Sequence, residues 1–291
     1  MVIKNQKSEI KNYFSLVKFA HTIFAMPFAM IGYFLGVVYA GAGFEWKTLL
    51  LVILCMVFAR NAAMGFNRYA DRLIDMKNPR TGNREIPAGA IKAQAALIFV
   101  IINAVFFVIT CWFLNPLVFF LSPVALLVVL GYSLTKKYTS LCHFVLGIGL
   151  SLAPIGAYLA VTGEFSWLPL MFSFAVLFWS GGFDIIYALQ DEDFDISERL
   201  HSIPARLGIR RALFVSAIAH TVTGLLVVII GFLWNFGIWY TTGAIVFLFL
   251  LLYQHLIVKP DDLSRVNAAF FTSNGIASVI FATFTILDLC L

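Results

Sequence analysis

The segment "NRYADRLID", residues 67–75, ends a long apolar run with two aspartates, two arginines and an asparagine. On a helix, Asn67, Asp71 and Asp75 recur every four residues and therefore share one face. Carboxylates one turn apart repel each other by roughly 0.2–0.5 kcal/mol even in water, and by more where the dielectric constant is lower. This spacing predicts that a cation lies between them.

A second acidic segment, "DIIYALQDEDFD" at 184–195, repeats the pattern. Helical spacing places four of its side chains on one face, namely Asp184, Tyr187, Asp191 and Asp195. Asp193 falls on the opposite face. For one segment alone, the acids could simply pair with neighbouring arginines at a solvated helix end. Two such segments on one side of a membrane favour a metal site instead.

The donor chemistry of these segments indicates which metal they would hold. Carboxylate and amide oxygens with no His or Cys nearby favour Mg²⁺ over zinc or copper. Mg²⁺ held by few carboxylates completes its shell with water and phosphate oxygens, so a diphosphate is the expected ligand. Flanking basic residues would add charge-assisted bonds to the phosphates: Arg72, Arg80, Arg84, Lys136 and Arg199.

The elements that position these residues follow from the composition. The chain has 291 residues, of which 61% are hydrophobic and 12% charged, and its mean hydropathy is +0.92. A soluble domain could not bury this much apolar side chain, so the chain belongs in a lipid bilayer. Windows of about 20 apolar residues, enough to cross a bilayer, predict spans at 16–40, 46–69, 93–114, 116–134, 141–161, 167–190, 211–233, 237–258 and 267–290. We expect one all-α domain over residues 1–291, with the first apolar segment kept as a span and not cleaved as a signal.

The basic residues are distributed unevenly between the two sides of this arrangement. All Lys and Arg residues except Lys47 and Arg60 lie before or near the start of the first span, or in the loops after the second, fourth, sixth and eighth spans and at the span ends that adjoin these loops. The positive-inside rule then places the N-terminus in the cytoplasm and the C-terminus outside. A bacterial-type inner membrane with a cytoplasmic active site is expected. Anionic lipid headgroups account for the basic charge without nucleic acid, and no obligate protein partner is indicated.

The four cysteines, Cys55, Cys111, Cys142 and Cys290, occur singly in apolar runs. No CxxC or Cys/His spacing is present, so neither a disulfide framework nor a zinc site is predicted. The cysteines are interpreted as small apolar fillers.

The two acidic segments resemble the N-x-x-x-D-x-x-x-D and D-x-x-Y-A-x-Q-D-x-x-x-D motifs of the UbiA family of intramembrane aromatic prenyltransferases. The continuations "NPRTGNREIPAGAI" and "HSIPARLG" extend the likeness over nearly the whole chain. The "YALQD" form looks most like the 4-hydroxybenzoate polyprenyltransferases. The resemblance implies nine transmembrane helices around a central cavity. It also implies Mg²⁺-dependent transfer of a polyprenyl group from an isoprenyl diphosphate to an aromatic acid acceptor, 4-hydroxybenzoate first, in respiratory quinone biosynthesis.

The resemblance also implies roles for individual residues. The metal ligands would be Asn67, Asp71, Asp75, Asp191 and Asp195, and the four aspartates would be the catalytic residues. "YSLTK" is similar to a Y-x-x-x-K element that would bring Tyr132 and Lys136 to the departing diphosphate. Arg80 and Arg84 match the basic residues that grip phosphate.

Other positions match the acceptor side of the family's cavity. Arg60 lies within a span, where charge is costly and tends to be functional, and is expected to bind the acceptor carboxylate. Asp184 and Tyr187 match the opening of the second motif and would line the cavity. Lys18, just before "FAHTIFAMPF", is a further candidate.

Two other functions fit parts of the sequence. A dihydroxynaphthoate in menaquinone synthesis would use Arg60 just as a hydroxybenzoate would. An ion-coupled secondary transporter would also place acids in spans, although transport sites usually lie near the bilayer midplane. Neither the isoprenoid length nor the identity of the acceptor follows from residue spacing.

Overall fold

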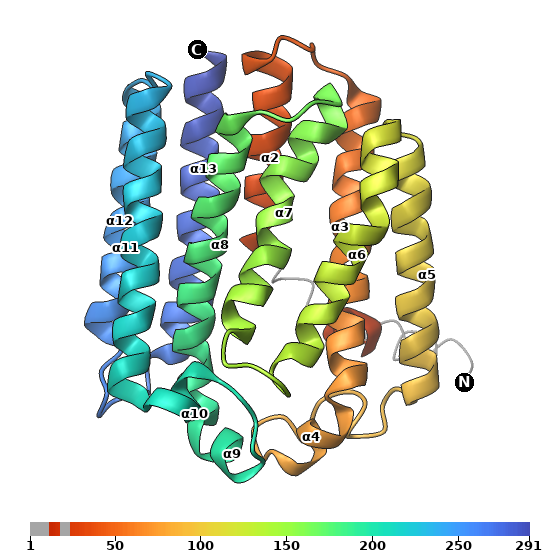
Figure 1. Cartoon of the computed structure of the whole chain (residues 1–291), viewed down its shortest axis with the longest axis vertical. Helices are drawn as coiled ribbons and strands as arrows, with labels where there is room; N and C mark the ends of the chain where they lie inside the picture. The colour runs from red at the N-terminus through yellow and green to blue at the C-terminus, as the bar shows by residue number, and fades with distance from the viewer. Residues whose placement is uncertain (1–11, 18–23) are drawn as a thin grey trace, which may run out of the picture.

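The computed structural model describes residues 12–17 and 24–291. Apart from one isolated bridge between Lys259 and Asp262, the regular elements of this part are helical. Lys18, a predicted site residue, lies outside the described residues. The elements with named bounds are α2 (Met26–Phe34), η2 (Leu35–Tyr39), α3 (Trp46–Ala70), α4 (Arg72–Lys77), α5 (Ala93–Trp112), α6 (Pro116–Thr135), α7 (Cys142–Thr162), α8 (Trp167–Ala188), η3 (Leu189–Asp191), α9 (Glu192–Ser197), α10 (Ile203–Leu207), α11 (Ile209–Leu233), α12 (Ile238–Ile257), η4 (Ala268–Ser273) and α13 (Asn274–Cys290) (Figure 1).

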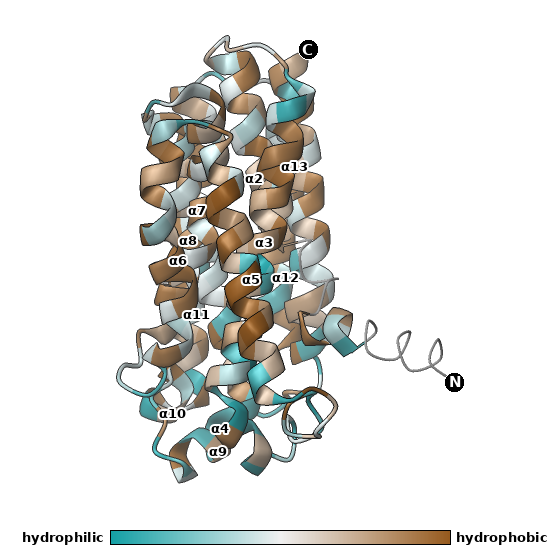
Figure 2. Cartoon of the chain, turned by 90° about the vertical axis from the view of Figure 1, so that its right-hand side faces the viewer, coloured by the Kyte–Doolittle hydropathy of each residue, from teal (hydrophilic) through white to brown (hydrophobic). Residues whose placement is uncertain are grey.

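The long helices confirm the prediction of an all-α membrane protein. In the described part, eight helices are long and apolar enough to cross a bilayer, and Met26–Tyr39 forms a shorter ninth apolar segment. Large apolar side chains such as Leu127 and Phe232 are exposed on the outer faces of these helices, as lipid-facing residues should be. The hydrophilic colour gathers at the end that holds α4, α9 and α10 (Figure 2). The chain is a multi-pass integral membrane protein.

Local sequence signals set several helix boundaries. The side chain of Asn115 accepts a hydrogen bond from Val118 N at 3.0 Å, and Pro116 occupies the first turn of α6, where its missing N–H is not needed. Gly163 ends α7 with a φ of 70°, a conformation that costs glycine little. Ser202 caps α10 by accepting from Ala205 N. These residues fix where α6 and α10 begin and where α7 ends.

Glycines allow α7 to approach two other helices closely. A Cβ at Gly32 of α2 would lie 2.0 Å from Pro154 O, and a Cβ at Gly147 of α7 would lie 2.5 Å from Leu177 O of α8. Any larger residue would force the helices apart. Close backbone approach at small residues is how membrane helices gain packing energy without a strong hydrophobic drive between them. The α2–α7–α8 group is therefore a closely packed unit.

The best-packed core lies among α2, α8, α11, α12 and α13. Its largest buried side chains are Trp179, Phe28, Phe172, Phe247 and Phe281. Two polar groups inside it share one acceptor, since Trp179 Nε1 and Gln254 Nε2 both donate to Asn274 Oδ1 at 2.9 and 2.8 Å. His220 and His255 also lie within hydrogen-bond distance, at 2.9 Å.

The other side of the bundle is packed less completely. In the apolar, membrane-length stretch of α8, 61% of the residues are buried inside the protein. The corresponding shares are 11% for α6 and 17% for α3. In α6, only Ser122 and Ser133 are buried. The α3–α6 side therefore presents most of its surface either to lipid or to an internal cavity.

Asp288, near the end of α13, fixes the start of α12. Its carboxylate accepts from Gly237 N at 2.6 Å, Trp239 N at 3.1 Å and Tyr240 N at 3.2 Å. These are N–H groups that the helix itself leaves unpaired. We expect Asp288→Ala to cost about 1–2 kcal/mol of stability and to lower the midpoint of thermal unfolding in detergent, measured by intrinsic fluorescence. Asp261→Ala, which removes an exposed loop carboxylate, is the control, and an equal loss in both variants would contradict this role of Asp288.

Candidate functional site

Both acidic segments lie where a long helix breaks at the polar end of the bundle. The helix α3 ends at Ala70, Asp71 has φ −93° and ψ 2°, and α4 starts at Arg72. Likewise α8 ends at Ala188 and passes through the 3₁₀ turn η3 into α9. The prediction of continuous helices through both segments is therefore wrong at these points. Because each break is short, Asp191 and Asp195 still face inward, both buried, whereas Asp193 is exposed.

The first segment forms a partly buried polar cluster. Asn67 Nδ2 donates to Asp71 Oδ2 at 3.0 Å, and Arg84 Nη1 donates to Asp75 Oδ1 at 2.7 Å. Asp75 is only 5% exposed, and its Oδ2 has no hydrogen-bond partner among the described residues. Burial and the charge of Asp75 raise the pKa of Asp71 to about 6. A cation bound between these two carboxylates would lower that cost.

Two side chains of the loop that follows α4 hold the second acidic segment in place. Asp191 Oδ1 accepts from Asn78 Nδ2 at 3.0 Å and from Arg80 Nε at 2.9 Å, and Arg80 Nη2 pairs with Asp191 Oδ2. Arg80 Nη1 also donates to Tyr187 Oη at 2.9 Å. Although burial alone would lower it, the pKa of Arg80 is raised by its hydrogen bonds and charge contact with Asp191. The two acidic segments thus meet through Asn78 and Arg80.

Asp195 is the most deeply buried of the acidic residues, with 0% exposure. Lys136 Nζ, just beyond the end of α6, lies 2.7 Å from Asp195 Oδ1. Both carboxylate oxygens of Asp195 lack a hydrogen bond of good geometry in the described part of the chain, so the contact with Lys136 is one of charge and proximity. Burial lowers the pKa of Lys136, but the charge of Asp195 outweighs that effect and the net shift is upward.

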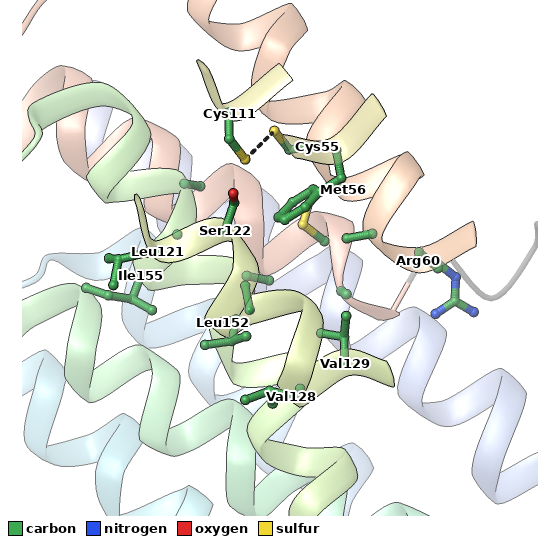
Figure 3. A pocket seen from close by; sticks show the side chains of 18 of the residues that line it. Cys55, Met56, Arg60, Cys111, Leu121, Ser122, Val128, Val129, Leu152 and Ile155 are labelled. Atoms are coloured by element: carbon green, nitrogen blue, oxygen red, sulfur yellow. Dashed lines mark hydrogen bonds between the residues drawn. The ribbon is translucent and has the colours of Figure 1, made fainter. Parts of the chain in front are cut away.

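An apolar cavity of about 400 Å³ runs between α3, α5, α6 and α7 (Figure 3). Its lining is almost entirely aliphatic, with Arg60 and Tyr132 among the few polar side chains. Arg60 Nε is buried and has no hydrogen-bond partner among the described residues. A cation that is partly buried, with a buried N–H left unpaired, is costly, so this position favours an anionic ligand in the apolar chamber.

Some of the predicted site residues have other contacts. Asp184 Oδ2 lies 2.7 Å from His143 Nδ1, and neither residue is in the lining of the cavity. Arg72 Nη1 donates to Tyr69 O at 2.7 Å, and its guanidinium stands 4.3 Å from the centroid of the Tyr69 ring. In the described residues, Arg72 has no ion pair with either acidic segment.

Sequence reasoning missed two residues that shape the site. Asn78 connects the two acidic segments, and the only signal for it is its place in "NPR" directly after the first segment. His143 fixes Asp184 and accepts a hydrogen bond from Ile203 N at 3.2 Å through Nε2. No spacing in the sequence could pair His143 with a carboxylate 41 residues away.

The donor set suits a hard divalent cation. Asp75 and Asp195 each keep buried oxygens without hydrogen bonds, and carboxylates are the ligands that Mg²⁺ prefers. Within residues 12–17 and 24–291, no three His, Cys, Asp or Glu side chains converge closely enough to hold a metal by themselves. A cation here would therefore need further oxygens, such as those of a diphosphate.

Known proteins resemble this chain in both sequence and fold. The sequence profile of the UbiA prenyltransferase family matches residues 25–275. A 4-hydroxybenzoate octaprenyltransferase of Tolumonas auensis is 32% identical over 244 residues, which cover 84% of this chain and 85% of the relative. The apo structure of a UbiA homolog from Aeropyrum pernix superposes with a TM-score of 0.83 at 31% identity, covering 92% of this chain and 98% of the homolog. A UbiA homolog from Archaeoglobus fulgidus, bound to DMAPP and Mg²⁺, shares the fold with a TM-score of 0.74 at 19% identity, covering 96% and 99%.

Proposed function

Because this chain belongs to the UbiA prenyltransferase family, we propose that it transfers a polyprenyl group from an isoprenyl diphosphate to 4-hydroxybenzoate in respiratory quinone biosynthesis. The observation that carries the choice of an aromatic acid is Arg60, a partly buried arginine in the wall of an apolar cavity, whose buried Nε has no hydrogen-bond partner among the described residues. The relatives named 4-hydroxybenzoate octaprenyltransferase, at about 30% identity, support the same acceptor. Membership of an enzyme family sets the transporter alternative aside.

The diphosphate would bind where the two acidic segments meet. Arg80, Arg84 and Lys136 each contact a carboxylate of the site, so their charges already point toward the place where Mg²⁺ and phosphate oxygens would lie. Asn67, Asp71, Asp75, Asp191 and Asp195 would hold Mg²⁺, which when bound neutralises the diphosphate and promotes its departure. The three basic side chains stabilise the leaving group more strongly as it gains charge, and this lowers the barrier to C–O cleavage.

The allylic carbocation that remains would face aromatic side chains. The Tyr187 ring stacks on Phe270 with centroids 4.2 Å apart and meets the edge of Phe271 at 5.9 Å. Ring faces stabilise a nearby cation by about 0.5–2 kcal/mol each. Because Arg80 holds the Tyr187 hydroxyl, the ring is oriented at the junction between the diphosphate groups and the apolar interior.

Arg60 would receive the acceptor, while Tyr132, in the wall of the same cavity, would reach toward the departing diphosphate with Lys136. The guanidinium can form a paired, charge-assisted contact with the carboxylate, which orients the ring carbon ortho to the phenol toward the donor. A dihydroxynaphthoate would use the same contact, and it is the second candidate acceptor. The distribution of basic residues supports an active site on the cytoplasmic side of a bacterial-type inner membrane.

Arg72 lies within the first acidic segment and Arg80 follows it, and we expect their replacement by alanine to have very different effects on catalysis. We expect Arg80→Ala to raise the donor KM and lower kcat/KM about 30- to 100-fold, because it removes charge-assisted bonds at the diphosphate. Arg72→Ala should change kcat/KM by less than about threefold, because Arg72 packs on Tyr69. Steady-state kinetics with varied donor concentration test this contrast. Equal losses of kcat/KM in the two variants would show that Arg80 does not bind the diphosphate.

Product formation by purified protein in liposomes tests the proposed reaction. Geranyl diphosphate or longer donors would be supplied with 4-hydroxybenzoate and 1,4-dihydroxynaphthoic acids as competing acceptors, with Mg²⁺ or with EDTA. We expect a Mg²⁺-dependent prenylated hydroxybenzoate, identified by mass spectrometry. Prenylation of the naphthoate alone would mean that the acceptor is a dihydroxynaphthoate and not 4-hydroxybenzoate. The absence of any product from folded protein would contradict the proposal.

A further inference from the structure

Two of the four cysteines come together in the cavity wall, although they lie 56 residues apart in the sequence. Cys55 Sγ of α3 and Cys111 Sγ of α5 are 3.7 Å apart, and both residues line the apolar cavity. Figure 3 shows the two side chains pointing at each other from neighbouring helices. The other two cysteines, Cys142 and Cys290, are also free thiols.

The separation of the sulfurs is short enough for a covalent bond after a small movement. A disulfide needs an S–S distance of about 2.05 Å, so the sulfurs would approach by about 1.7 Å. The helices α3 and α5 pack side by side along their length, and the cavity beside the thiols leaves room for the side chains to rotate. The pair is therefore placed for reversible dithiol–disulfide chemistry.

The surroundings of the pair restrict which oxidant can reach it. Cys111 is 1% exposed, and the lining of the cavity near the pair is apolar, with Met56, Phe107 and Leu121 in the wall. Peroxide or a charged disulfide would have to leave water to enter such a chamber. A quinone is an apolar two-electron oxidant that dissolves in the bilayer, so its chemistry suits this apolar chamber better.

We propose that Cys55 and Cys111 are a redox-sensitive thiol pair that a bilayer-soluble quinone oxidises to a disulfide, and that the resulting link between α3 and α5 slows prenyl transfer. In this step both S–H bonds break and one S–S bond forms. The quinone takes the two electrons and two protons and leaves as the hydroquinone. The slowing rests on the proposed transferase function, whereas the thiol chemistry does not.

The effect on transfer follows from the position of Cys55 on α3. Arg60 lies five residues further along the same helix, about 7.5 Å, and the same helix continues to Asn67 and the break at Asp71. A link that draws α3 toward α5 at Cys55 changes the width of the cavity and fixes the helix that carries these groups. The pair therefore couples the amount of oxidised quinone in the membrane to the rate of the enzyme that serves quinone synthesis.

The test uses full-length protein in liposomes with Cys142→Ala and Cys290→Ala, so that only the pair retains thiols. Duroquinone is the oxidant, because its four methyl groups block addition of a thiol to the ring. We expect both thiols to disappear and the peptides containing Cys55 and Cys111 to be joined, lighter by two hydrogen atoms. Prenyl transfer should fall about fivefold or more and return after treatment with dithiothreitol.

Further variants of this background separate the proposal from its alternatives. With Cys55→Ala or Cys111→Ala, the ratio of rates with and without duroquinone should stay close to one. Persistence of both thiols, a quinone adduct in place of the link, or a disulfide with no change in rate would each overturn the proposal. If reduced protein transfers no prenyl group to any acceptor, the proposed function fails, and the peptide masses still decide the thiol chemistry.

Discussion

Replacing Asp191 with asparagine is expected to lower kcat/KM by about a thousandfold or more, because the change removes a negative charge from the proposed Mg²⁺ and diphosphate site. Asp191 is 8% exposed and joins Asn78 and Arg80 of the first loop, so Arg80 would also lose its ion pair. The variant keeps the shape of the side chain and should remain folded. Initial rates of product formation at saturating Mg²⁺ and subsaturating donor measure the loss of kcat/KM.

Asp193→Asn is the matched control for this prediction. It makes the same chemical change two residues away, on the exposed side of α9, and should leave kcat/KM within about twofold. Thermal unfolding of both variants in detergent shows whether either has lost its fold. Full activity of a folded Asp191→Asn protein would show that the Asp191 carboxylate is not part of the catalytic site.

Replacing Arg60 with leucine should raise the KM of the aromatic acid about 100-fold, because a buried charge-assisted pair with the carboxylate is lost. The KM of the isoprenyl diphosphate should change little, since its proposed contacts come from Arg80, Arg84 and Lys136. Leucine suits the apolar wall of the cavity, and we expect the loss of a partly buried charge without an ion pair to leave the protein folded. Kinetics with each substrate varied in turn separate the two constants.

Lys47→Leu provides the control for Arg60, because Lys47 is an exposed cation at the far end of the same helix. Both KM values should stay unchanged in this variant. A decarboxylated acceptor such as phenol gives a second check, since its reaction should be equally slow with wild-type protein and with Arg60→Leu. If Arg60→Leu weakens donor and acceptor to the same extent, Arg60 belongs to the donor site.

The long elements could be predicted because hydrophobic length carries their signal. The predicted spans 93–114 and 116–134 lie within two residues of α5 (Ala93–Trp112) and α6 (Pro116–Thr135), since loops with Asn, Pro or Lys separate the apolar runs. Helical periodicity also predicted that Asp193 would turn away while Asp191 and Asp195 faced inward. Spacing along one helix is a local property, so the sequence contains it.

The breaks at Asp71 and Leu189 could not be predicted, because neither residue is a strong helix breaker and tertiary contacts stabilise the bends. Pairs between distant segments were equally hidden, as with Asn78 and Asp191 or His143 and Asp184. The prediction for Arg72 was based on its place beside the acids of the first segment, and that for Asp184 on the opening of the second motif. In the structure, the carbonyl of Tyr69 and the imidazole of His143 are nearer partners.

The uneven packing of the two sides of the bundle bears on how such an enzyme can change. Substitutions in α8 or α13 disturb interlocked aromatic side chains, and most of them should be eliminated by selection because the protein would no longer accumulate. Substitutions in α6 alter a surface that few buried contacts depend on, so they can accumulate without loss of the protein. Directed evolution toward donors of other lengths should therefore sample α6 first.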